Sequence, residues 1–249
     1  MTGVLPIALQ ESTKALQALL AGGKEYICVM KLHGDIEYEK VIRVFKEFVG
    51  EIYQRPPLRS SVKRQVRTRT VYYNHVLQIK ERNVLFRMGC QAGTYVRKIA
   101  HDIGEVLGCG AHIVEIRRTR SGFYTENNSL VTLHDLSDAY AYWKEGDEQP
   151  LSSSILPMET AVELLPKVWV KDSAVGAICH GAHLAVPGIS KLNSRIRERD
   201  LLAVITLKDE LVALGEAQIS GEKMVEEDHG IAAKTVRVIM AVNAYPKAW

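Results

Sequence analysis

The cluster Lys24-Glu25-Tyr26 places an aromatic side chain with acid–base chemistry at the entry to an expected strand. A tyrosine there can stack on a planar substrate or act as an acid or base. Taken alone, an ordinary half-buried strand aromatic is the simpler interpretation. The cluster therefore makes Tyr26 a candidate without fixing its role.

Two further clusters supply arginines. Residues 93–97 (GTYVR) form an expected strand-to-helix turn that puts Arg97 in the first turn of a helix. The helix dipole disfavours a cation at that end, so Arg97 either has an anionic partner or is a surface arginine. Residues 116–122 (IRRTRSG) form a strand that runs into a basic turn and carries Arg117 and Arg118.

Metal and nucleotide motifs are weak or absent in the sequence. Cys179, His180 and His183 lie close together, and CGAH at 109–112 echoes HGAH at 180–183. Each cluster has too few ligands for a zinc site, and turn geometry explains both. There is no phosphate-binding glycine loop, GxSxG or HExxH. We expect no metal and no cofactor.

The basic residues are concentrated in one segment, although the net charge of the 249-residue chain is only +3. Residues 55–98 hold eleven Lys and Arg and one acid, and six of those bases lie between Arg55 and Arg69. Residues 121–164 hold one base and eight acids. A confined basic block is typical of a surface that binds nucleic-acid phosphates, and the alternative is a solvated loop. The lack of compensating acids favours a polyanion partner.

Compartment signals point to the cytoplasm. The chain has no run of eighteen apolar residues, and its start lacks a secretory signal. The four scattered cysteines without a CxxC pair fit a reducing environment.

Periodicity predicts an alternation of helices and strands, with Asp35 capping a helix whose apolar face is Val41, Val44, Phe45 and Phe48. The segment Arg55–Arg69 has few core-forming residues and reads as a mobile arm, and residues 71–79 alternate as a strand. The other expected elements are helices at 12–20, 94–107 (ended by Gly108) and 132–143 (with a Thr132–Asp135 cap), and strands at 25–33, 84–90 and 111–118.

Composition divides the chain near a linker at residues 144–164, which is charged and contains Gly, Pro and serines. Beyond the linker the sequence pattern predicts short strands with tight turns, including a hairpin around residues 208–209. Residues 165–249 are therefore expected to form a small β-barrel-like domain. Composition and spacing therefore predict a two-domain protein that binds RNA or DNA.

Read in order, five segments resemble the TruB-type pseudouridine synthases, and among them the dyskerin-like branch of archaeal and eukaryotic H/ACA ribonucleoproteins. The end of the chain, residues 228–249, resembles the close of a PUA domain, and the missing lysine-rich tail favours an archaeal protein. The resemblance implies an α+β fold: a partial, mixed-sheet catalytic domain at 1–143, the linker, and a PUA domain at 165–249. The segments are TGVLPIAL (2–9), KEYICVMKLHG (24–34), RPPLRSSVKRQVRTRTVYY (55–73), GTYVRKIAHDIGEVLG (93–108) and GAHIVEIRRTRSG (110–122).

One departure from the family concerns the nucleophile. In the family, TGVLPIAL follows a GTLDP-like segment whose aspartate attacks the sugar, and this chain begins at Met1-Thr2. Asp35 is the first aspartate in the chain, and it is expected to cap a helix. The start is misassigned, the chain is a fragment, or it is inactive.

The resemblance assigns catalytic roles to three residues. Tyr26 would stack on the flipped uracil and help remove the C5 proton, and Ile116 would line the pocket. Arg97 would pair with the upstream aspartate, and without that aspartate it would be an unpaired, partly desolvated cation. Arg55–Arg69 matches a thumb loop that closes over RNA. The RNA-binding residues expected are Lys31, Arg59, Lys63, Arg64, Arg67, Arg69, Arg117, Arg118, Gly181 and Ala182.

The implied activity is isomerisation of uridine in rRNA directed by an H/ACA guide RNA, with possible action on the uridine of the tRNA TΨC loop. The implied partners are the guide, the substrate RNA, a zinc-ribbon-like peptide, a small β-barrel protein and a kink-turn-binding protein. The alternatives are a non-catalytic H/ACA scaffold, which lack of the aspartate would favour, and a general RNA chaperone.

Overall fold

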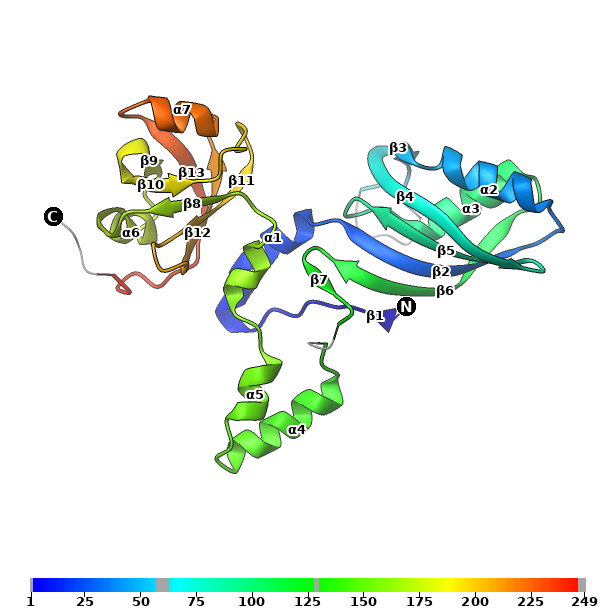
Figure 1. The fold of residues 1–249 in the computed structure, drawn as a ribbon, viewed down its shortest axis with the longest axis horizontal. Coiled ribbons are helices and arrows are strands. Elements are labelled where there is room, and N and C mark those ends of the chain that lie inside the picture. The colour runs from blue at the N-terminus through cyan, green and yellow to red at the C-terminus, as the bar shows by residue number, and fades with distance from the viewer. Residues whose placement is uncertain (1, 57–62, 128–129, 246–249) are drawn as a thin grey trace. The chain divides into compact units, whose positions relative to one another are not determined.

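The computed structural model describes residues 2–56, 63–127 and 130–245 (Figure 1). The chain divides into two compact units. One comprises residues 1–6 and 21–130, and the other comprises residues 7–20 and 131–249.

The first unit is built on a mixed sheet in the order β1-β6-β2-β5-β4-β3, with β7 paired to β6. β1 runs parallel to β6 and the other neighbours are antiparallel, as the predicted α+β class requires. The strands are β1 (Thr2–Gly3), β2 (Lys24–Leu32), β3 (Gly50–Gln54), β4 (Arg67–Lys80), β5 (Asn83–Cys90), β6 (Ala111–Ser121) and β7 (Tyr124–Thr125).

Helices α2 (Tyr38–Glu47) and α3 (Val96–Leu107) lie along one face of this sheet (Figure 1). β2 alternates so that every second residue, from Tyr26 to Leu32, is buried under them. The predicted apolar stripe of α3 is buried, and Gly108 ends the helix at φ 81°, a left-handed conformation that suits glycine. The helix and strand expected there are therefore confirmed.

The expected cap at Asp35 is wrong. Glu37 is the N-cap of α2, and no side-chain cap is made there. Asp35 instead accepts two 2.8 Å hydrogen bonds from the Arg82 guanidinium, in the turn between β4 and β5. A bidentate arginine–carboxylate pair holds the side chain away from the helix.

The basic segment is only partly an arm. Arg67 and Arg69 belong to β4, where they pair with Gln54 and Ile52 of β3. β-Bulges in β4 also interrupt the alternation expected for residues 71–79. Arg59 lies outside the described residues.

The second unit contains a six-stranded sheet in the order β10-β8-β11-β12-β13-β9. The predicted hairpin is formed by β11 and β12, and α4 carries the predicted Thr132–Asp135 capping box. The strands are β8 (Lys167–Val170), β9 (Leu184–Ala185), β10 (Ile189–Leu192), β11 (Leu201–Ile205), β12 (Leu211–Ala217) and β13 (Ile231–Val238). The helices are η1 (Gln10–Ala15), α1 (Leu16–Ala21), α4 (Leu133–Lys144), α5 (Gln149–Ser154), η2 (Met158–Val162), α6 (Asp172–Cys179), η3 (Val186–Gly188) and α7 (Gly221–Glu226).

The segment expected to be a linker, 144–164, holds α5 and η2. The domain limits expected from composition stay a prediction. Within the described ranges, no helix has the length and apolar character to cross a membrane. In the same ranges, no three His, Cys, Asp or Glu side chains are grouped to hold a metal ion.

Candidate RNA-modifying site

Tyr26 sits on the central strand β2 with its side chain on the buried face of the sheet. It pairs in register with Met88 of β5 and Arg118 of β6 and is 8% exposed. Burial raises the pKa of the Tyr26 phenol above its ordinary 10.0, and a nearby Cys90 adds to this. The phenol is therefore protonated at neutral pH. Because so little of the ring is exposed, a base can stack on it only after neighbouring groups move.

Arg118 is the polar neighbour of Tyr26. Its charge and a hydrogen bond to the phenol act to lower the Tyr26 pKa, against the larger effect of burial. Its Nε also donates a 2.6 Å hydrogen bond to the carbonyl oxygen of Val4, directly after β1. Arg118, expected to bind RNA, is thus engaged inside the protein with the strand that carries Tyr26 and with the N-terminal segment.

Ile116 and Arg97 occupy different surroundings. Ile116 is 6% exposed, pairs with Cys28 of β2, and belongs to the core beneath the helices. Arg97 lies in the first turn of α3 and is exposed, so the expectation of a partly desolvated cation is wrong for this structure. The structure groups Tyr26, Ile116 and Arg118 on two paired strands, while Arg97 comes from the helix.

A hydrogen-bond network holds the opposite side of β2 at the residue before Tyr26. Glu25 accepts a 2.5 Å hydrogen bond from the Tyr73 hydroxyl and a 2.6 Å hydrogen bond from the Thr119 hydroxyl. Burial alone would raise the pKa of Glu25, but these bonds and the charges of Arg87 and Arg120 outweigh it and lower the pKa. The ionised carboxylate links β4, β2 and β6 beneath the candidate site.

Gly89 makes this network possible. It pairs with both Glu25 and Tyr73, and a Cβ added there would lie 2.3 Å from the Tyr73 ring. The ring therefore passes over β5 to reach β2. A glycine inside a strand signals such a close approach, so this feature could have been found in the sequence.

The basic residues lie mainly around the start of β4. Lys31, Lys63 and Arg64 are exposed, and Arg67 and Arg69 are half-buried. The Arg69 guanidinium lies against Gly93, 3.3 Å from where a Cβ of that glycine would stand. An open pocket of about 500 Å³ lies beside them, lined by Tyr53, Arg55, Pro56, Arg64, Val66, Lys98 and Asp102. In this pocket Lys98 forms an ion pair with Asp102, and the guanidinium groups of Arg55 and Arg64 suit a phosphate-bearing ligand.

Three other expected RNA contacts are only partly free. Arg117 is exposed but pairs with Glu126 at 2.8 Å. Gly181 is exposed at φ 91°, in the turn after α6. The Ala182 carbonyl accepts a 2.6 Å hydrogen bond from the Thr235 hydroxyl, which joins this turn to β13. RNA contact by these residues stays a prediction.

Family models cover nearly the whole chain. Residues 1–96 match the TruB family pseudouridylate synthase N-terminal domain, and residues 97–163 match the tRNA pseudouridylate synthase B C-terminal domain. Residues 166–239 match the PUA domain. These matches define a class of RNA-modifying enzyme joined to a PUA domain.

The relatives place the chain more narrowly. A probable tRNA pseudouridine synthase B of Pyrococcus furiosus is 57% identical over all of this chain and 74% of its own length. A solved Cbf5-Nop10-Gar1 complex contains a chain with a TM-score of 0.95 and 57% identity, covering 99% of this chain and 75% of that one. A solved H/ACA RNP bound to a substrate RNA containing 2'-deoxyuridine contains a chain with a TM-score of 0.92 and 54% identity. The match covers 99% of this chain and 75% of that one.

This chain belongs to the TruB family of pseudouridine synthases. The resemblance to the H/ACA branch and to archaeal members is confirmed by these matches.

Proposed function

We propose that this chain is the catalytic subunit of a guide-directed RNA pseudouridine synthase, with rRNA as its main substrate and the tRNA TΨC loop as a further one. The observation that carries this proposal is the 57% identity, over 99% of the chain, with a chain of a Cbf5-Nop10-Gar1 complex. The reaction cleaves the N-glycosidic bond of a uridine, turns the base and rejoins it through C5.

In this proposal Tyr26 stacks on the flipped uracil and, once its phenol has given up its own proton, takes part in removing the C5 proton. An aromatic face stabilises an unstacked base by about 1–3 kcal/mol. Ile116 closes the apolar wall, and Arg97 pairs with the aspartate nucleophile that precedes TGVLPIAL in the family. The pairing of Thr2 with Arg117 supports the placement of Ile116 in this arrangement, because β1 lies beside the strand that carries Ile116.

The basic residues around the start of β4, together with Lys31, bind substrate RNA, and the PUA domain binds the guide through its exposed 181–182 turn. Relatives of the Nop10 and Gar1 proteins bind the particle, together with a kink-turn-binding protein. Two supports are the match to the H/ACA RNP with substrate RNA and the pocket lined by Arg55, Arg64 and Lys98. We place the protein in the cytoplasm, with a partial catalytic domain at 1–143 and a PUA domain from 165.

A tritium-release assay on C5-labelled uridine RNA tests this function. It compares the 249-residue chain with a version extended upstream through a GTLDP-like segment, each with guide RNA and accessory proteins. Release only from the extended protein supports the proposal. Release from the 249-residue chain would show that another residue is the nucleophile. Guide binding without release from either would favour the scaffold.

A further inference from the structure

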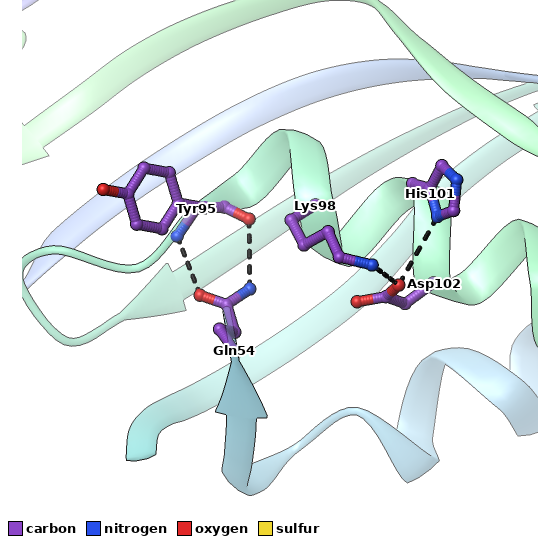
Figure 2. Close-up of polar contacts among 5 residues, drawn as sticks. All are labelled: Gln54, Tyr95, Lys98, His101 and Asp102. Atoms are coloured by element: carbon purple, nitrogen blue, oxygen red, sulfur yellow. Dashed lines mark hydrogen bonds and ion pairs between the residues drawn. The ribbon is translucent and has the colours of Figure 1, made fainter. Parts of the chain in front are cut away.

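Gln54, the last residue of β3, makes a two-point contact with the start of α3. Its side chain is 3% exposed. Its Nε2 donates a 3.1 Å hydrogen bond to the Tyr95 carbonyl oxygen, and its Oε1 accepts a 2.9 Å hydrogen bond from the Tyr95 N–H (Figure 2). Both polar atoms of the buried amide are therefore hydrogen-bonded to a single residue, 41 positions further along the chain.

Tyr95 is the N-cap of α3, and its own side chain makes no cap hydrogen bond. Its carbonyl oxygen also accepts from the backbone N–H groups of Lys98 and Ile99, at 3.0 and 3.1 Å. Gln54 thus fixes the peptide groups from which the first helical turn grows. Arg97 is the second residue of that turn.

Gln54 also stands at the base of the basic segment. It immediately precedes Arg55, and in the β3–β4 ladder it pairs with Arg67. The same helical turn contributes Lys98 to the pocket that Arg55 lines.

We propose that Gln54 is a positioning residue that holds the first turn of α3 and so places Arg97 for the reaction. The proposal rests on the proposed role of Arg97. The two amide hydrogen bonds join the end of β3 to the backbone of Tyr95, and so to the first turn of α3.

Two substitutions separate positioning from general stability. Gln54→Met keeps the length of the side chain and removes both hydrogen bonds, while Gln54→Glu keeps the acceptor for the Tyr95 N–H. Asn74→Leu is the matched control. Asn74 is also 3% exposed, and its amide donates a 3.2 Å hydrogen bond to the Phe45 carbonyl, which ties β4 to α2 rather than α3.

The first test is amide hydrogen exchange on the chain itself, which requires no catalysis. Gln54→Met should speed exchange at Tyr95, Lys98 and Ile99 by about tenfold relative to Asn74→Leu, because the helix start loses its support. Equal exchange in the two variants would overturn the proposal.

The second test is the single-turnover rate of pseudouridine formation by the upstream-extended protein with saturating guide and substrate RNA. Gln54→Met should slow the reaction about tenfold, with Gln54→Glu between it and wild type, because a misplaced catalytic group costs rate. Asn74→Leu should stay within about twofold of wild type, and Gln54→Met should add less than about twofold in an Arg97→Lys background. An additive loss would overturn the proposal. An inactive wild type counts against the proposed function, and the exchange result then decides whether Gln54 positions the helix.

Discussion

Replacing Gly89 with alanine should break the network beneath Tyr26. The new Cβ would stand 2.3 Å from Cζ of Tyr73, well inside van der Waals contact, so the ring must swing away. That movement removes the 2.5 Å hydrogen bond from Tyr73 to Glu25. The Thr119 hydrogen bond to Glu25 remains.

The cost follows from the kind of bond lost. A hydrogen bond to a charged group contributes about 1.5–3 kcal/mol. Tyr73 is half-buried and can move outward, so we add no overpacking term. We expect Gly89→Ala to lower the free energy of unfolding of the first unit by about 2 kcal/mol. Tyr73→Phe, which removes only the hydroxyl, should cost a similar amount.

Hydrogen exchange of the β2 and β5 amides under increasing urea is the suitable assay. All three tryptophans, at 143, 169 and 249, lie in the second unit, so their fluorescence does not report on this sheet. With the ring removed by Tyr73→Ala, Gly89→Ala should cost less than about 0.5 kcal/mol. A full, additive cost in that background would refute the reasoning.

Three further predictions concern packing, thiol chemistry and pH. Gly104→Ala should destabilise α3 packing by about 3 kcal/mol, measured by urea unfolding, because its Cβ would stand 2.2 Å from the backbone nitrogen of Ala111. Iodoacetamide at pH about 8 should label Cys109 before Cys28 in mass spectrometry, because burial raises the pKa of Cys28 to about 12 and Cys109 is only half-buried. The lowered pKa of Glu25 gives stability above its ordinary pKa of 4.5 that is lost as pH falls through the folded value, so Glu25→Gln should flatten the acid limb of a stability–pH curve.

Local periodicity predicted the elements that position the site. The stripe of α3 and its glycine stop are short-range signals, since residues three and four apart share one helix face. The strand expected at residues 25–33 likewise placed Tyr26 on a strand, which is β2. The roles of Tyr26 and Arg97 came from the family resemblance and remain predictions.

Long-range contacts escaped the sequence reading. The sequence placed Arg118 in a basic cluster, but only the strand register shows that it lies beside Tyr26. Asp35 was expected to cap a helix, but the fold brings Arg82, which lies in a turn far along the chain, into hydrogen-bond contact with it. No sequence pattern indicated a role for Gln54, because its hydrogen bonds are made to a helix start 41 residues away.

The most direct test of the account is tritium release from C5-labelled uridine by the upstream-extended protein carrying Tyr26→Phe, assembled with guide RNA and accessory proteins. The account predicts that substrate RNA affinity stays within about twofold while release is lost, because the ring still stacks but the hydroxyl is gone. Release at the wild-type rate would contradict the assignment of Tyr26 as the residue that acts on the C5 proton.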